Sequence, residues 1–318
     1  MCPNLTSLDC NWIDEYEADL LNHVPWSVTR LVLPYPMDYL YGLEGVGASP
    51  ILVESGLLLR HVDENLKRMV IVNQTGECVV ASPTLEYLAL DIEATEYSLT
   101  LCCPNLTRLV IEADTTEELM KSVLTCSNLE YLEVERYSAN LAMLRGLRRL
   151  TSLVVNLDDD SGRVISGSAL PQSLTRLDIV RSAVTLMIES EETLPRLLML
   201  SCCYLSGVLP KSLRVLEFLY RVPTSVHLKG IPLTSLNVDY IRDELLEELP
   251  STLIELVMSN RLLNRPKELP SRIRRLTVYG VASKNWSFAN LQYVACDGPI
   301  TEEQQKEFKG HTCIVARR

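Results

Sequence analysis

A six-position apolar pattern recurs along the whole chain and constrains its fold more than any other feature. The pattern is L-x-x-L-x-L with aliphatic, Phe or Cys variants, and its forty-two key positions are all apolar. Its fourteen copies begin at Leu5, Val28, Leu66, Leu85, Leu106, Leu129, Leu150, Leu174, Leu197, Leu213, Leu233, Leu253, Ile273 and Leu291. Successive copies start 16 to 24 residues apart, except for one step of 38 that predicts two units, one of them degraded, near SPILVES. Self-similarity at such a period is typical of a solenoid.

Each copy of the pattern predicts one short strand. Apolar and polar residues alternate within it, as in LTRLVIE (106–112) and LEYLEVE (129–135), which is the period of a strand with one buried face. About 14 residues separate the copies. Among these connections, TEELMKSVLT (116–125) and DELLEEL (243–249) have helical spacing, whereas DDDSGR (158–163) is polar and predicts a loop. Strands joined by such short crossovers must run parallel and stack side by side.

The pattern and its step resemble those of the leucine-rich repeat superfamily over essentially the whole chain. The eighth position after the first Leu, where that superfamily commonly has Asn or Cys, is variable here, which indicates an irregular subclass. LPQSLTRLDI (170–179) and LPSTLIELVM (249–258) are similar to FNIP-type repeats and to the short L-P-x-x-L repeats of bacterial effector proteins. CPNL (103–106) and CSNL (126–129) resemble F-box-type leucine-rich repeats, although no F-box precedes them.

The resemblance implies an α/β solenoid with about 14 to 15 repeats. Its curved parallel sheet lies on the concave face, and short helices or irregular arcs lie on the convex face. We expect a single domain over 1–318, with longer repeats in 1–196, shorter repeats in 197–296 and a C-terminal cap in 297–318. The cap sequence, TEEQQKEFKGHTCIVARR, predicts a helix followed by a closing strand.

Charge and motif content exclude several functions. There are 41 acidic and 30 basic residues, so the net charge of −11 argues against nucleic acid or an anionic membrane as partner. No apolar run is long enough to span a membrane and no signal peptide is recognisable, so we expect a cytoplasmic protein. Phosphate-binding, G-x-S-x-G and H-E-x-x-H motifs are all missing, which predicts a protein without enzymatic activity or a small-molecule cofactor.

The cysteines look like core residues rather than metal ligands. Cys202 takes the third apolar position of its pattern, and Cys103 and Cys126 stand three residues before the first Leu, where other repeats have an aliphatic residue. The sequence has no C-x-x-C, and its four histidines are scattered, so we expect no bound metal. Cys102 has no assigned role.

Outward-facing positions of the predicted sheet are the candidate functional site. The first outward column, two residues after each first Leu, contains five Arg and three Tyr in fourteen positions, and acidic residues fill the neighbouring columns. The candidate partner-binding residues are Arg68, Tyr87, Asp91, Arg108, Glu112, Tyr131, Glu133, Glu135, Arg176 and Asp178.

Two interpretations of these columns remain open. Arg and Glu on neighbouring strands stabilise a sheet by about 0.2 to 1 kcal/mol per pair without recognising anything. Alternatively, Tyr and Arg, which are enriched in binding hot spots, form a stripe that binds another protein, with Val110 and other valines adding apolar area. We expect a protein–protein interaction scaffold or recognition module. The alternatives are a substrate-recognition subunit of a ubiquitin ligase and a structural subunit of a large assembly.

Overall fold

The computed structural model describes the chain in sixteen segments, which form two compact units. The segments are 7–9, 30–33, 51–53, 56–60, 67–72, 76–91, 97–137, 140–157, 163–180, 183–221, 226–240, 248–259, 271–279, 288–296, 301–308 and 312–315. The units comprise residues 1–158 and 159–318. Their boundary lies in the polar DDDSGR segment.

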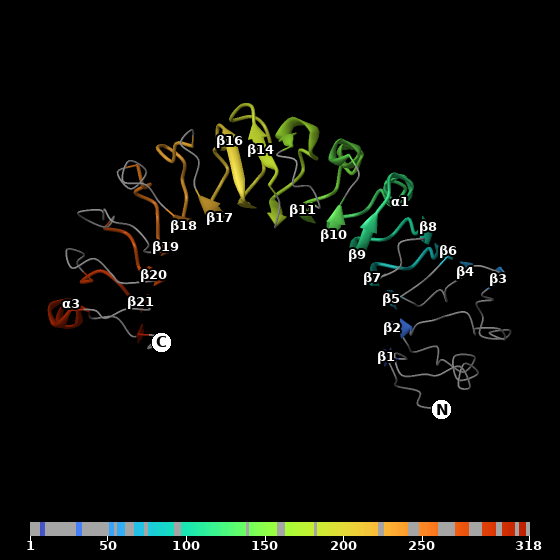
Figure 1. Cartoon of the computed structure of the whole chain (residues 1–318), viewed down its shortest axis with the longest axis horizontal. Coiled ribbons are helices and arrows are strands. Elements are labelled where there is room, and N and C mark those ends of the chain that lie inside the picture. The colour runs from blue at the N-terminus through green and yellow to red at the C-terminus, as the bar shows by residue number, and fades with distance from the viewer. Residues whose placement is uncertain are drawn as a thin grey trace. The chain divides into compact units, whose positions relative to one another are not determined.

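Parallel strands form the main sheet of each unit (Figure 1). In the first unit they are, in order, β1 (Ser7–Asp9), β2 (Arg30–Leu33), β5 (Arg68–Val72), β7 (Tyr87–Asp91), β9 (Arg108–Thr115), β10 (Tyr131–Tyr137) and β11 (Ser152–Asn156). In the second they are β13 (Arg176–Val180), β15 (Met199–Cys202), β17 (Val215–Arg221), β18 (Ser235–Tyr240), β19 (Glu255–Ser259), β20 (Arg275–Tyr279), β21 (Tyr293–Cys296) and β22 (Thr312–Val315). Each of the fourteen sequence patterns supplies one strand, which begins two residues after the first Leu. The predicted strand in every repeat is thus confirmed.

The three apolar positions of each pattern form the core. In the eleven repeats from Leu85 to Cys296 whose side chains are described, all of these positions are buried and none is more than 4 % exposed. Burying such a side chain contributes roughly 1.5 to 3 kcal/mol relative to exposure. Because no repeat covers this apolar edge alone, each repeat depends on its neighbours for stability.

A tight turn precedes most of the main strands whose approach the structure describes, and it explains their prolines. In these turns the N–H of the first Leu donates to the carbonyl three residues earlier, as in Leu106 to Cys103 at 3.1 Å and Leu253 to Pro250 at 3.0 Å. This bond closes a four-residue turn in which proline is tolerated at the early positions, since its fixed φ suits them. Pro104 occupies the second position of its turn.

Short strands and helices form the other side of the repeats. The first unit has a four-stranded outer sheet of β3 (Ile51–Val53), β4 (Gly56–Arg60), β6 (Gly76–Ala81) and β8 (Tyr97–Cys102), and the second has a three-stranded one of β12 (Val164–Ser166), β14 (Thr185–Ile188) and β16 (Tyr204–Gly207). Among the described residues the helices are α1 (Glu117–Val123), α3 (Glu302–Glu307) and the 3-10 turns η3 (Leu141–Gly146) and η4 (Gly167–Ala169). In the described part of the chain, no helix is both long and apolar enough to cross a membrane.

Two of the predicted helices lie in described segments and are confirmed. The side chain of Thr116 accepts a hydrogen bond from the Leu119 N–H at 3.2 Å and caps α1, as TEELMKSVLT predicts. Thr301 and Gln304 form a capping box at α3, and β22 then pairs with β21 to close the C-terminal cap. Most of the predicted helix at 243–249, and residues 158–162 of the predicted loop, lie outside the described residues.

The interpretation of the 38-residue step as two repeats is wrong. Strand β2 pairs directly with β5, with Arg30 opposite Arg68, so the intervening residues add no strand to the main sheet. The SPILVES segment instead supplies β3, which pairs antiparallel with β4 in the outer sheet. An apolar run of three residues fits either sheet, because both bury one face of a strand.

Candidate partner-binding surface

The first outward column is a true row of neighbouring side chains in the first unit. Parallel pairing puts Arg68 opposite Tyr87, Tyr87 opposite Arg108, and Arg108 opposite Tyr131. Adjacent strands are about 4.8 Å apart, so side chains in such a row are within contact distance. The row lies on the open face of the main sheet, by which we mean the face opposite the buried leucines. The side chain of Arg68 lies outside the described residues.

Tyr87, Arg108 and Tyr131 form what we call the tyrosine–arginine stack. The guanidinium carbon of Arg108 is 4.2 Å from the centre of the Tyr131 ring and 5.7 Å from that of Tyr87. Both distances are within the range of a cation–π interaction. Arg108 is exposed and the two tyrosines are half-buried, so the stack is accessible from the open face.

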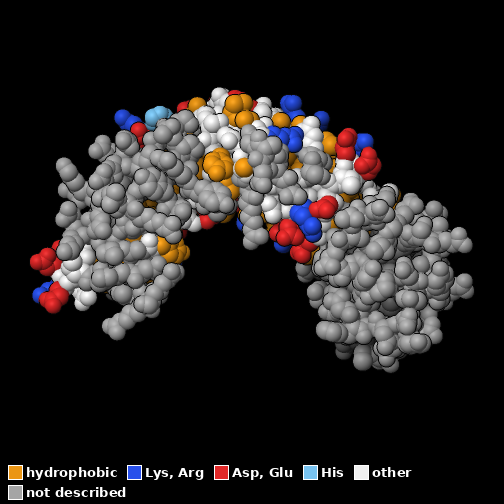
Figure 2. All heavy atoms as spheres, viewed as in Figure 1, with side chains coloured by type: hydrophobic (Ala, Val, Ile, Leu, Met, Phe, Trp, Pro, Cys, Tyr) orange, Lys and Arg blue, Asp and Glu red, His pale blue; other side chains and the backbone are white. Residues whose placement is uncertain are grey.

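Three glutamates, Glu112, Glu133 and Glu135, lie beside the stack on β9 and β10, and we call them the acidic rim. Glu112 and Glu135 are exposed and Glu133 is half-buried. The hydroxyl of Tyr131 donates to Oε2 of Glu133 at 2.5 Å, which joins the rim to the stack. Figure 2 shows acidic and basic side chains gathered near the place that β10 occupies in Figure 1.

A bulge lies at the end of the acidic rim. The register of β9 and β10 shifts between Val134 and Arg136, so Glu112 and Ala113 on β9 are opposed by the single residue Glu135 on β10. Beyond it, the Nε atom of Arg136 is 3.4 Å from Oδ1 of Asp114, and both side chains are about half exposed. The backbone of Asp91 pairs with that of Glu112, but the Asp91 side chain lies outside the described residues.

The expected apolar area between these charges is small at the centre of the surface. Val110 is only 8 % exposed, because the larger side chains of the stack and the rim flank it on the open face. Val154 and Val257 are half-buried on β11 and β19. Binding at this face would therefore depend on the tyrosines and the charges more than on valine.

In the second unit the predicted residues Arg176 and Asp178 pair with each other. Oδ2 of Asp178 accepts from Nε of Arg176 at 2.8 Å and lies 2.6 Å from the second guanidinium nitrogen. Asp178 is 5 % exposed, and its other carboxylate oxygen is buried with no hydrogen-bond partner among the described residues. This pair lies within β13, so it occupies both charges without joining neighbouring strands as the cross-strand interpretation expects.

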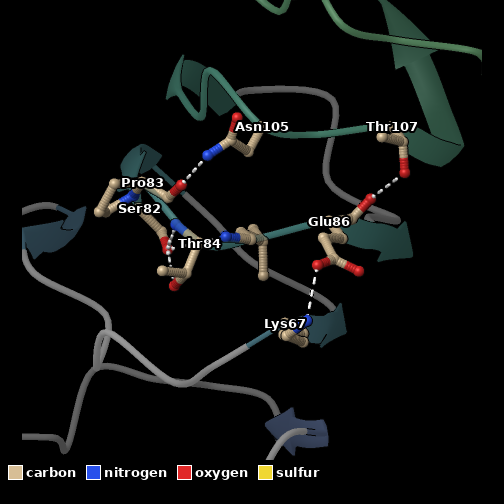
Figure 3. A network of polar contacts seen from close by, with 8 residues as sticks. Lys67, Ser82, Pro83, Thr84, Glu86, Asn105 and Thr107 are labelled. Carbon is tan, nitrogen blue, oxygen red and sulfur yellow. Dashed lines mark hydrogen bonds and ion pairs between the residues drawn. The ribbon is translucent and has the colours of Figure 1, made fainter.

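Polar side chains at the strand starts form a network that the sequence interpretation missed (Figure 3). Oγ1 of Thr107 donates to the Glu86 carbonyl at 3.0 Å, and Nδ2 of Asn105 donates to the Pro83 carbonyl at 2.5 Å. Lys67 and Glu86 form an ion pair at 2.8 Å. Each bond links one repeat to the preceding one, as an asparagine ladder would. The available signal was the Asn that directly precedes the first Leu in PNL and SNL, since Asn128 likewise donates to the Pro104 carbonyl at 2.8 Å.

The cysteines that were predicted to be core residues, and whose side chains the structure describes, are buried. Cys103, Cys126 and Cys202 are buried, and burial raises the pKa of the Cys103 thiol to about 12. Cys102 is exposed. No three His, Cys, Asp or Glu residues of the described segments come together in a way that could hold a metal ion.

A second surface of a different kind lies on the outer sheet of the second unit. Val164, Met187 and Tyr204 are 55 %, 37 % and 40 % exposed on the neighbouring strands β12, β14 and β16. Figure 2 shows hydrophobic side chains at this place. The outward positions on these three strands are Val164, Ser166, Thr185, Met187, Tyr204 and Ser206. None of these six residues is charged.

No protein-family model matches the chain, and no curated protein matches its sequence. One parallel strand per repeat, with all three apolar positions buried, decides the assignment. The chain folds as a leucine-rich repeat solenoid.

Solved structures of leucine-rich repeat proteins are similar at low sequence identity. A leucine-rich repeat protein of Leptospira interrogans is 17% identical with a TM-score of 0.49, and the match covers 98% of this chain and 96% of that chain. The TLR13–ssRNA13 complex is 14% identical with a TM-score of 0.38, and the match covers 99% of this chain and 71% of that chain. YopM from Yersinia enterocolitica is 16% identical with a TM-score of 0.32, and the match covers 92% of this chain and 83% of that chain. These similarities concern the solenoid fold and not the open-face residues.

Proposed function

We propose that this leucine-rich repeat chain is a non-enzymatic recognition module that binds a protein partner through the open face of its first unit. The tyrosine–arginine stack is the observation that supports this proposal most directly. Three neighbouring strands place Tyr87, Arg108 and Tyr131 in one accessible row. Repeat solenoids commonly use such extended sheet surfaces for binding.

The stack has properties that favour binding over sheet stabilisation. Tyr and Arg are enriched among residues that contribute most to protein interfaces, because each offers a large contact area together with polar groups. Mutual stacking restrains the Arg108 side chain before any partner arrives, which lowers the entropy lost on binding. Ion pairing within β13 accounts for Arg176 and Asp178, but ion pairing gives no reason for two tyrosines on the open face.

The charge of the chain narrows the class of partner. A net charge of −11 disfavours nucleic acid and anionic membranes, so we place a protein on this face. We also propose that the chain acts as one domain in the cytoplasm, where buried thiols such as Cys103 and Cys126 remain reduced.

The test is partner capture from the native source with a double variant. Tyr87→Ala with Tyr131→Ala removes both rings of the stack, and hot-spot truncations cost about 2 kcal/mol or more each. We expect captured partners to fall below detection in quantitative mass spectrometry. The matched control is Tyr204→Ala with Tyr279→Ala, which removes two exposed tyrosines from the second unit. Unchanged capture of every partner by the Tyr87/Tyr131 variant would contradict the proposed function.

A further inference from the structure

The guanidinium of Arg108 keeps its N–H groups without an acceptor inside the protein. The rings of Tyr87 and Tyr131 lie on either side of it, on three neighbouring strands of the main sheet (Figure 1). The N–H groups point outward in the plane of the guanidinium, so stacking against the rings does not satisfy them. Within the described part of the chain, the Arg108 side chain makes no hydrogen bond and no ion pair.

Two other arginines of the same column have an acceptor in the chain itself. Arg176 donates to Asp178 at 2.8 Å. Arg275 stacks on a tyrosine ring at 5.3 Å, as Arg108 does, but it also pairs with Glu255 at 3.3 Å. Arg108 therefore has the restraint that stacking provides and lacks the internal carboxylate. A restrained guanidinium with free donors is pre-organised for an acceptor that comes from outside.

The geometry of the guanidinium selects the kind of acceptor. A carboxylate accepts two parallel N–H···O bonds from the fork of an arginine, and such charge-assisted bonds are roughly twice as strong as neutral ones. A phosphate matches the same fork. The surroundings of the stack distinguish between these two anions.

Those surroundings limit the acceptor to a single carboxylate. Glu133 lies two residues beyond Tyr131 on β10 and accepts its hydroxyl at 2.5 Å, so negative charge already borders one side of the stack. A phosphodiester chain or a run of acidic residues would meet this charge and be repelled. The outward residues that follow the stack on β7 and β9 are Ala89 and Val110, which are short and uncharged. One carboxylate that approaches Arg108 over them meets no like charge at these two positions.

The backbone around the stack favours a side-chain carboxylate over the carboxylate at a chain terminus. Sites that capture a chain terminus use unpaired backbone N–H groups. Here β7, β9 and β10 are each paired on both sides, so their N–H groups are used in the sheet.

We propose that Arg108 binds the side-chain carboxylate of an Asp or Glu residue on the protein partner, between the rings of Tyr87 and Tyr131. This inference rests on the proposed function, because it names the group that the same surface recognises. The guanidinium supplies the two hydrogen bonds, and the tyrosine rings contact the apolar part of the acidic residue and its neighbours.

The test joins the partner carboxylate covalently to position 108. Arg108→Lys introduces a primary amine, and a water-soluble carbodiimide couples that amine to a carboxylate in contact with it. An amide forms, and the carbodiimide takes up the lost water and becomes a urea. The full-length variant is treated in nuclease-treated extract of the native source, and peptide mass spectrometry locates the new amides. We expect an amide between position 108 and an Asp or Glu side chain of a partner that the wild type also captures.

The matched control for coupling is Arg275→Lys. Its amine replaces an arginine of the same column that is exposed and stacked, but that already has Glu255 as its acceptor. We expect this variant to form an amide with Glu255 of its own chain and none with a partner.

Affinity for the partner identified in this way provides the second measurement. We expect Arg108→Gln to weaken binding about 30-fold, as truncation of an interface hot spot does, and Arg275→Gln to weaken it less than twofold. Changing the coupled acidic residue of the partner to its amide should add little to the effect of Arg108→Gln, because both changes remove the same pair. Arg108 and Arg275 are exposed, so these substitutions leave the core intact.

Three results would overturn the carboxylate proposal. Capture that is lost after nuclease treatment would make the acceptor a phosphate. Amides formed only with a partner's C-terminal carboxylate, or only with carboxylates of this chain, would mean that no partner side chain reaches position 108. Binding by Arg108→Gln that equals or exceeds wild-type binding would mean that the guanidinium recognises no anion.

The proposed function fails in a different way. If Tyr87→Ala with Tyr131→Ala captures every partner normally, or if the wild type captures none, the open face of the first unit is not the binding surface. If the tyrosine variant loses the partner while Arg108→Gln binds it normally, the face binds a protein and only the carboxylate is wrong. Loss of binding in both variants, with Arg275→Gln unaffected, supports both proposals.

Discussion

Two leucines near the start of β15, one at a key position of the repeat pattern and one outside it, test the burial on which the fold depends. Leu200 is fully buried in the core, whereas Leu198, two residues earlier, is 47 % exposed. Leu200→Ala removes about 2 to 3 kcal/mol of transfer free energy and leaves a cavity, so we expect a loss of about 3 to 5 kcal/mol. Leu198→Ala removes a half-exposed side chain without forming a cavity, and should cost about 1 kcal/mol or less.

Hydrogen exchange measures this difference repeat by repeat. A loss of about 3 kcal/mol lowers the protection of amides in β13, β15 and β17 by roughly 100-fold, because repeats are stabilised by their immediate neighbours. Amides in β20, which is not adjacent to these strands, should change much less. Equal effects of Leu198→Ala and Leu200→Ala, or uniform loss across the second unit, would refute the reasoning.

Two glycine substitutions and one cysteine-labelling experiment test the surroundings of single residues. Gly207 has φ +91, and a Cβ there would collide with the Ile188 carbonyl, so Gly207→Ala should destabilise the fold well beyond about 1 kcal/mol. Gly230, at φ +83 with open space around it, isolates the strain alone, and denaturant unfolding of Gly230→Ala should show the smaller shift. At pH 9 we expect iodoacetamide to modify exposed Cys102 but not Cys103, whose pKa is raised to about 12 by burial; peptide mass spectrometry checks this. Because the unfolded Cys103 thiol ionises near pH 9.0, its contribution to stability is complete below that pH and falls as the pH rises toward 12; equal alkylation of both thiols would contradict the assignment.

The strands of the main sheet could be predicted from the sequence, and the outer elements only in part. Fourteen copies of one pattern fix where each strand begins, because burial of three leucines per repeat dominates the energy. The outer segments vary in length and composition from repeat to repeat. They therefore share no recurring pattern from which their secondary structure could be predicted. YSLTLC in β8 alternates as a strand does, with Leu99 and Leu101 buried, yet so short a run is compatible with an irregular arc.

Local conformation that the core imposes was also beyond prediction. Leu194 has φ 55, a left-handed conformation that is unfavourable for a residue with a side chain, and it directly precedes a proline. Its side chain is fully buried, and its carbonyl accepts the Leu197 N–H at 3.0 Å in the turn before β15. Packing and the turn hydrogen bond together offset the backbone strain at Leu194. Neither interaction can be predicted from the sequence alone.

The position of a residue in an outward column does not by itself predict the role of its side chain. Arg108, Arg176 and Arg275 occupy the same column, but their surroundings differ. Arg176 is followed two residues later by Asp178 on its own strand and pairs with it, and Arg275 lies opposite Glu255 and pairs with it at 3.3 Å.

Arg108 is followed at the same spacing by Val110 and lies opposite tyrosine on both sides, so its charge is stacked rather than neutralised by a neighbour in the column. The residue two positions along the strand and the residue opposite on each neighbouring strand therefore decide whether an outward arginine stabilises the sheet or remains available to a partner. By this criterion, recognition should concentrate in the first unit, where the stack and the acidic rim coincide.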